Sequence, residues 1–192
     1  MLQRSDLWSL EEYSEHRKAF REQVLAHKEN RRVLLGGHLL MTFEDSQTIK
    51  YQVQEMLRIE KIFEADAIKE ELDAYNPLIP DGDNWKCTLL IQYEDVDERK
   101  RRLTELVGVE DVIWLKIGDL EKIYPIADED MDRSNDDKTA AVHFMRYQLT
   151  NEQVEAAKAG EALSFGVDHV AYPCEELVLD ENQRQSLVAD LG

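Results

Sequence analysis

The pattern of apolar and polar positions predicts a helix near the start of the chain. Ser9 and Glu12 have the spacing of a capping box, in which each side chain bonds the backbone at the helix start. After them, apolar Tyr13, Phe20 and Val24 recur on one helical face. We therefore expect a helix that begins next to Ser9 and continues to about residue 28.

The remainder of the chain alternates between strand and helix signals. Apolar runs bounded by turn residues predict strands at 33–43 (interrupted by two glycines), 48–53, 85–93, 112–117, 120–126, 141–149 and 163–167. Helical spacing predicts helices around 56–63, 68–75, 97–106, 150–160 and 180–191. Short turns join several of the strands, which favours antiparallel pairing over a parallel sheet.

These elements predict an α+β fold in a single domain, residues 1–192. We expect an antiparallel, barrel-like sheet of about six or seven strands, with helices packed on one side. The segment 127–138 is acidic and nearly free of apolar residues, so we expect a mobile loop there.

The amino-acid composition of the chain limits the classes of molecule that it can bind. The chain has 41 acidic and 23 Lys and Arg residues, a formal net charge of −18, and 43% hydrophobic residues. Such a surface repels nucleic acid and anionic membranes, whereas the apolar content suffices for a core. Two distant cysteines form no disulfide framework, the N-terminus lacks a signal-peptide pattern, and no apolar run reaches the length of a membrane span. We expect a cytoplasmic protein.

No motif indicates a reaction, a cofactor or an oligomeric state. The phosphate-binding GxxxxGK[ST] loop and the dinucleotide-binding GxGxxG turn are both absent from the sequence. The hydrolase GxSxG elbow and the zinc-binding HExxH helix are absent as well. Candidate site residues are therefore single polar residues that occur at otherwise apolar positions.

Glu60 is one such residue. On a helical wheel it falls between Met56 and Phe63, inside the apolar face. A carboxylate in that position needs a partner or a raised pKa. It has two interpretations: a structural ion pair, or a general acid/base or metal ligand.

The strand 141–149 carries two more candidates. His143 shares one face with Met145 and Tyr147, and Arg146 lies on the opposite, also mostly apolar face. Arg146 suits a buried carboxylate, and we predict an ion pair with Glu60. His143 is either a hydrogen-bonded core histidine or a site residue.

Other histidines flank predicted strands. His38 follows the two glycines, and His169 and Tyr172 lie on a turn after the strand 163–167. If these strands are neighbours, we expect any metal or catalytic site to contain His143 and Glu60 together with at least one of His38 and His169.

Several blocks of the sequence resemble an uncharacterised bacterial family, the domain of unknown function 3501. The blocks are LEEY at 10–13, QVQEMLRIE at 52–60, LDAYN at 72–76, AVHFMRY at 141–147 and DHVAY at 168–172. Members of that family are often encoded beside a rubrerythrin and an iron–sulfur protein of the heterodisulfide-reductase type. The resemblance implies an accessory role in redox or peroxide defence, with a redox partner protein, and it transfers no catalytic residue.

Three functions remain open at this point. The first is an accessory protein whose acidic surface docks a basic patch on a redox partner. The second is a metal-binding protein or enzyme with a carboxylate–histidine site. The third is a small-molecule binding module with a pocket between sheet and helices.

Overall fold

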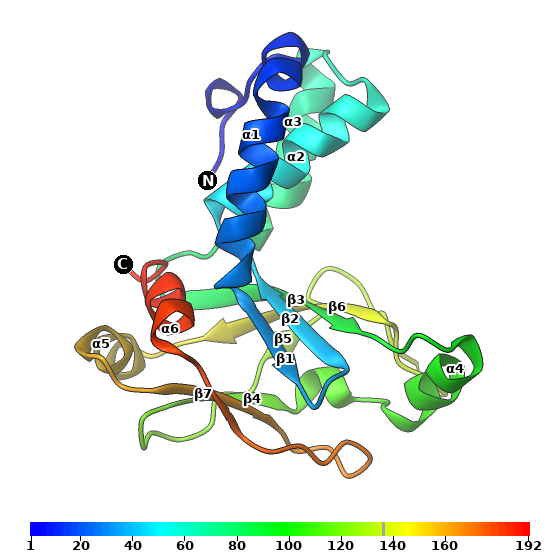
Figure 1. Ribbon diagram of the computed structural model, residues 1–192, viewed down its shortest axis with the longest axis vertical. Coiled ribbons are helices and arrows are strands. Elements are labelled where there is room, and N and C mark those ends of the chain that lie inside the picture. The colour runs from blue at the N-terminus through cyan, green and yellow to red at the C-terminus, as the bar shows by residue number, and fades with distance from the viewer. Residues whose placement is uncertain (136) are drawn as a thin grey trace.

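The computed structural model describes residues 1–135 and 137–192, and it has a mixed α+β fold (Figure 1). Six α-helices lie in the described chain: α1 (Leu10–Glu29), α2 (Ser46–Glu60), α3 (Ala65–Tyr75), α4 (Val96–Glu105), α5 (Asn151–Ala159) and α6 (Glu181–Val188). Short 3-10 turns occupy Arg4–Asp6, Asn76–Leu78 and Val109–Asp111. None of these helices is long and apolar enough to cross a bilayer.

The strands form two antiparallel sheets. They are β1 (Arg32–Leu35), β2 (Leu39–Phe43), β3 (Asn84–Ile91), β4 (Ile113–Ile117), β5 (Ile126–Ala127), β6 (Val142–Gln148), β7 (Leu163–Val167) and β8 (Leu177–Val178). One sheet has the order β1-β2-β3-β6-β5 and the other the order β4-β7-β8. Both sheets are open, so the expected barrel-like closure is absent from the described residues.

The inner faces of the two sheets enclose the main core. Phe43 of β2 and Tyr147 of β6 contact Phe165 of β7, with ring centroids 5.6 and 5.9 Å apart. The Tyr147 hydroxyl donates a hydrogen bond of 2.9 Å across the core to the carbonyl of Ile113. Burial of such aromatic side chains supplies much of the stability of the core.

The first three helices form an arm that stands away from the sheets (Figure 1). Ser9 and Glu12 make the predicted capping box, and α1 begins at Leu10. The arm joins the sheets at Arg31, which is only 1% exposed. Its guanidinium bonds the carbonyls of Phe43 and Glu44 and pairs with Asp190 next to α6. One buried side chain thus connects the end of α1 to the end of β2 and to the C-terminal helix.

The strand expected at 48–53 is wrong, because this segment belongs to α2. The Asp45 side chain accepts hydrogen bonds from the backbone N–H groups of Gln47 and Thr48, which caps a helix. Ile49, Val53 and Leu57 are then buried on one face, at helical spacing. The β-branched residues imitate a strand, and the helix arises from its cap and from packing against α1 and α3.

Two other strand predictions change in detail. The expected single strand 33–43 is a hairpin, in which β1 and β2 pair around Gly36 and Gly37. Both glycines have positive φ, 55° and 84°, as the turn requires. The predicted hairpin of 112–117 with 120–126 is reduced to one bridge between Leu115 and Ile123, and β4 also pairs along its length with β7.

Candidate functional site

Strand β6 positions different groups on its two faces. His143, Met145 and Tyr147 share one face, as the alternation predicts, and this face is buried between the sheets. Phe144 and Arg146 are half-buried on the outer face. A site lies on each side of this strand: a buried carboxylate–histidine cluster inside and an open pocket outside.

The inner site consists of His143, Asp128 and Glu110. The His143 ring is fully buried, and the side chains of Asp128 and Glu110 are 10% and 6% exposed. One ligand-type atom from each residue lies within 4.8 Å of the other two. The three residues come from separate elements, namely β6, the segment after β5 and the turn Val109–Asp111.

Both ring nitrogens of His143 face oxygen atoms. Nδ1 lies 2.7 Å from Oδ2 of Asp128. Nε2 lies 2.8 Å from the hydroxyl of Thr139 and 3.0 Å from the carbonyl of Ala140. These partners suit an imidazolium that donates from both nitrogens, since neutral histidine has only one N–H.

Hydroxyl groups complete the network around Glu110. Thr139 donates a hydrogen bond of 3.0 Å to one carboxylate oxygen, and Ser134 donates to the other. Asp128 has a positive φ of 52° and accepts from the backbone N–H of Phe144 at 3.0 Å. Every buried polar side-chain atom in the described residues has a partner. The cluster is therefore a complete network that also holds the acidic segment against β6.

The other residues proposed from the sequence lie elsewhere. Glu60 is exposed at the last residue of α2, and the nearby Phe63 is 67% exposed. Arg146 pairs with Glu129 at 2.7 Å, so the expected Glu60–Arg146 ion pair is wrong. The apolar face that encloses Glu60 on a wheel is not covered by other elements at this end of the helix.

His38, His169 and Tyr172 support loops. The His169 ring bonds the carbonyl of Val107 and accepts from the backbone N–H of Ala171. The Tyr172 hydroxyl donates to the carbonyl of Leu35 and accepts from the backbone N–H of His38. Burial raises the pKa of Tyr172 to about 12. In the described chain, none of these three side chains bonds His143, and the carboxylate–histidine cluster around His143 contains none of them.

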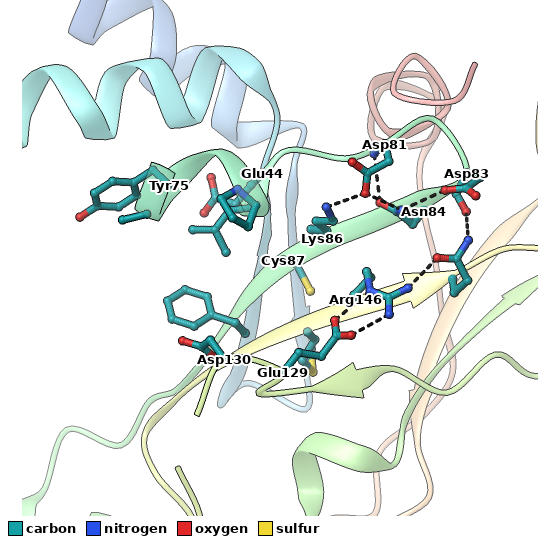
Figure 2. Close-up of a pocket in the computed structure, with 16 residues that line it drawn as sticks. Glu44, Tyr75, Asp81, Asp83, Asn84, Lys86, Cys87, Glu129, Asp130 and Arg146 are labelled. Carbon is teal, nitrogen blue, oxygen red and sulfur yellow. Dashed lines mark hydrogen bonds and ion pairs between the residues drawn. The ribbon is translucent and has the colours of Figure 1, made fainter. Parts of the chain in front are cut away.

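The outer site is a pocket between the outer face of β3 and β6 and the base of the helical arm (Figure 2). Its volume is about 830 Å³. Its lining is Glu44, Ala74, Tyr75, Pro77, Leu78, Asp81, Asp83, Asn84, Lys86, Cys87, Glu129, Asp130, Phe144, Met145, Arg146 and Gln148. Sequence reasoning named only Arg146 among these as a site residue.

Ion pairs form part of the pocket wall. Lys86 and Arg146 are direct cross-strand partners on β3 and β6. Lys86 pairs with Asp81 at 2.7 Å, and Arg146 makes two bonds of 2.7 and 2.8 Å to Glu129 (Figure 2). The Arg146 bonds lower the pKa of Glu129, and the Lys86 bond lowers that of Asp81.

The acidic segment contributes to both sites. Asp128 lies in the inner cluster, whereas its neighbours Glu129 and Asp130 line the outer pocket. Arg133 pairs with Asp128 at 3.1 Å, and its guanidinium lies 4.6 Å from the ring centroid of Phe144. Asp136, within the segment expected to be mobile, lies outside the described residues. One short stretch of chain thus joins the two faces of β6.

Comparisons with known proteins show what this chain is similar to. A crystal structure of a novel protein of unknown function from Burkholderia pseudomallei K96243 shares 46% sequence identity and a TM-score of 0.93. The match covers 100% of this chain and 99% of that one. No curated protein matches the sequence. The family model described as "Protein of unknown function (DUF3501)" matches residues 1–191, so the chain belongs to that family.

Proposed function

We propose that this protein is a small-molecule binding module whose ligand occupies the pocket between the β3–β6 sheet and the helical arm. The observation that carries the proposal is the pocket itself. Its volume of about 830 Å³ lies within the range of ligand sites, and aromatic and aliphatic side chains line it together with seven charged residues. Tyr75, Leu78 and Phe144 supply apolar contact area.

The pocket is also accessible to a ligand, and its walls are formed by rigid elements. Its floor is the paired strands β3 and β6, which are held in register along seven residue pairs. Its opposite wall comes from the end of α3 and the following turn, where Pro77 limits backbone freedom. A site between a rigid sheet and a helical arm can bind ligand without refolding.

A neutral aromatic probe tests this function. We expect 2-naphthylmethanol to shift the methyl NMR signals of Leu78, with a dissociation constant of about 1 mM, the range for a probe of this size. Ala74→Trp fills the pocket and should abolish the shifts. Ala65→Trp, at an exposed position at the other end of the same helix, is the control and should keep them. Equal responses from both variants would refute the pocket as the binding site.

The inner cluster favours a second function, a metal site. Nε2 of His143 lies 3.9 Å from a Glu110 oxygen, a separation that suits two ligands of one ion with bonds of about 2.1 Å. Asp128 on Nδ1 would then orient the ring, as carboxylates do beside metal-bound histidines. Nitrogen and oxygen donors of this type suit Zn²⁺, Mn²⁺ or Fe²⁺. The ion would replace the proton on Nε2.

Metal analysis distinguishes this site from a hydrogen-bonded network. Protein purified without a histidine tag is analysed by inductively coupled plasma mass spectrometry. A metal site predicts about one ion per chain, lost in Glu110→Gln and kept in the exposed control Asp97→Asn. Metal-free protein that stays metal-free after incubation with Zn²⁺, Mn²⁺ and Fe²⁺ would reject the site.

The family resemblance adds a prediction about context. An accessory role beside a redox partner in the cytoplasm fits the acidic composition. Both cysteines are free, as expected in a reducing compartment. Co-purification of the tagged, chromosomally expressed protein with a rubrerythrin or an iron–sulfur protein tests this role.

A further inference from the structure

The charges around the outer pocket do not balance. Five carboxylates and two cationic side chains line it. Both cations already have a carboxylate partner, because Lys86 pairs with Asp81 and Arg146 with Glu129. A third lining carboxylate, Asp130, pairs with Arg133, so Glu44 and Asp83 are left over and the surplus charge is negative. An anionic ligand would have to displace one of these partners before it could bind a cation.

Among the carboxylates that line the pocket, the buried carboxylate of Glu44 has the charge that neighbouring groups balance least. It follows β2, directly before the cap of α2, and it is 5% exposed. Its carboxylate accepts from the hydroxyls of Thr48 at 2.6 Å and Thr88 at 3.3 Å. None of the ion pairs in the described part of the chain includes it, although a buried carboxylate normally has a cationic partner.

Nearby groups stabilise this charge only in part. The N-terminus of α2 carries a partial positive charge, which favours an anion at Glu44. Two hydroxyl donors leave further lone pairs on the carboxylate free, since it has about four acceptor positions. A cation that enters the pocket can take these positions, and the desolvated carboxylate would bind it more strongly than an exposed one.

Aromatic residues lie in the same pocket. Figure 2 draws Tyr75 and Glu44 toward one end of the pocket, and Asp83 and Arg146 toward the other. Phe144 also lines the pocket. Aromatic faces attract organic cations and pack against flat apolar groups. The pocket thus combines a buried acceptor for a positive charge with apolar area for the body that carries it.

We propose that the pocket selects an organic ammonium ion with a flat apolar body, and that Glu44 binds the ammonium group. This inference rests on the proposed small-molecule function and specifies its ligand class. The ammonium donates hydrogen bonds to the carboxylate of Glu44, and the body lies against Tyr75 and Phe144. Anions of the same size are excluded by the surplus of carboxylates.

Three probes of nearly equal size test the charge preference: 2-naphthylmethylammonium, 2-naphthylmethanol and 2-naphthoate. Isothermal titration at pH 7 and low salt should give an affinity for the ammonium about tenfold or more above that for the alcohol, with the weakest binding for the carboxylate. Glu44→Gln should remove the preference and leave the affinity for the alcohol within about twofold. Glu70→Gln removes one exposed charge of α3 outside the pocket and should keep the preference.

The outcomes separate the two proposals. If none of the probes binds, the small-molecule function fails. If the alcohol and the ammonium bind equally, or if Glu44→Gln keeps the full preference, the pocket binds ligands but the assignment of Glu44 as the cation anchor is overturned. A circular dichroism melt of each variant shows whether a loss of binding reflects unfolding.

Discussion

On the inner side of β6, His143 has an oxygen partner at each ring nitrogen, whereas on the outer side the carboxylate of Glu44 has two hydroxyl donors and no cation. Both groups are at least 95% buried. The inner cluster closes on itself, and the outer pocket leaves both space and charge open. The comparison teaches that burial of a charged group does not by itself indicate a ligand-binding site. A buried charge that lacks an oppositely charged partner does indicate one.

The largest expected effect comes from removing a charge on the inner side. Asp128→Asn keeps the shape of the side chain and tolerates the positive φ, but it removes the negative charge beside the buried His143 ring. We expect a loss of about 3 kcal/mol in the free energy of unfolding, measured in urea. Glu129→Gln changes the next residue, whose side chain is 50% exposed, and should cost less than about 1 kcal/mol.

If Asp128→Asn and Glu129→Gln lower the free energy of unfolding equally, the comparison is contradicted. The buried and the exposed carboxylate would then contribute equally to stability. A small cost for both would mean that the buried network contributes little net stability.

The next largest effect is expected on proteolytic cleavage of the acidic segment 127–138. The segment is acidic and nearly free of apolar residues, and we predict that a nonspecific protease cuts the native chain first between residues 129 and 138. Since Asp128 holds the segment to β6, Asp128→Asn should speed this cleavage by about tenfold. Mass spectrometry of the early fragments locates the cut. First cleavage in the arm instead would show that the segment is held firmly.

Most of the regular structure can be predicted from the sequence, for reasons that are local. The capping box of Ser9 and Glu12 marks α1, and the alternation around His143 correctly places His143, Met145 and Tyr147 on one face of β6. The strand predicted at 48–53 failed because Ile49 and Val53 are also good helix-face residues, and the cap at Asp45 was the missed signal.

The partners in the sites are not local and could not be predicted in the same way. Glu110 lies in a 3-10 turn, and Asp128 follows a two-residue strand. Neither position has a periodic pattern. Their approach to His143 depends on how the two sheets pack. Glu44 lies between the strands predicted at 33–43 and 48–53, and only the position of the arm places it in a pocket.

A third variant applies the same chemical change to the outer side. Glu44→Gln removes a buried charge that has no cationic partner, so the free energy of unfolding should change by less than about 1 kcal/mol in either direction. The contrast with Asp128→Asn is the informative quantity, since both variants convert a buried carboxylate to an amide. A loss of about 3 kcal/mol from Glu44→Gln would indicate a structural charge and would weaken its assignment as a ligand anchor.

The smallest expected effect is on the stability of the protein at acidic pH. Hydrogen bonds from Arg146 lower the pKa of Glu129, and those from Lys86 lower that of Asp81. A lowered pKa in the folded protein means that each pair stabilises it above the ordinary carboxyl pKa, and that this contribution is lost as the pH falls through the lowered value. Arg146→Met should therefore flatten the decline in stability below about pH 4.5, by about 0.5 kcal/mol because Glu129 is half exposed. An unchanged slope in urea melts from pH 6 to pH 3 would show that the pair contributes nothing.

The most direct test of the central claim is a crystal structure with 2-naphthylmethylammonium bound. The account predicts that the ammonium nitrogen lies about 2.8 Å from a carboxylate oxygen of Glu44, with the rings against Tyr75 and Phe144 and the inner cluster unchanged. Density for the probe at another site, or in this pocket with its ammonium directed to solvent and away from Glu44, would contradict it.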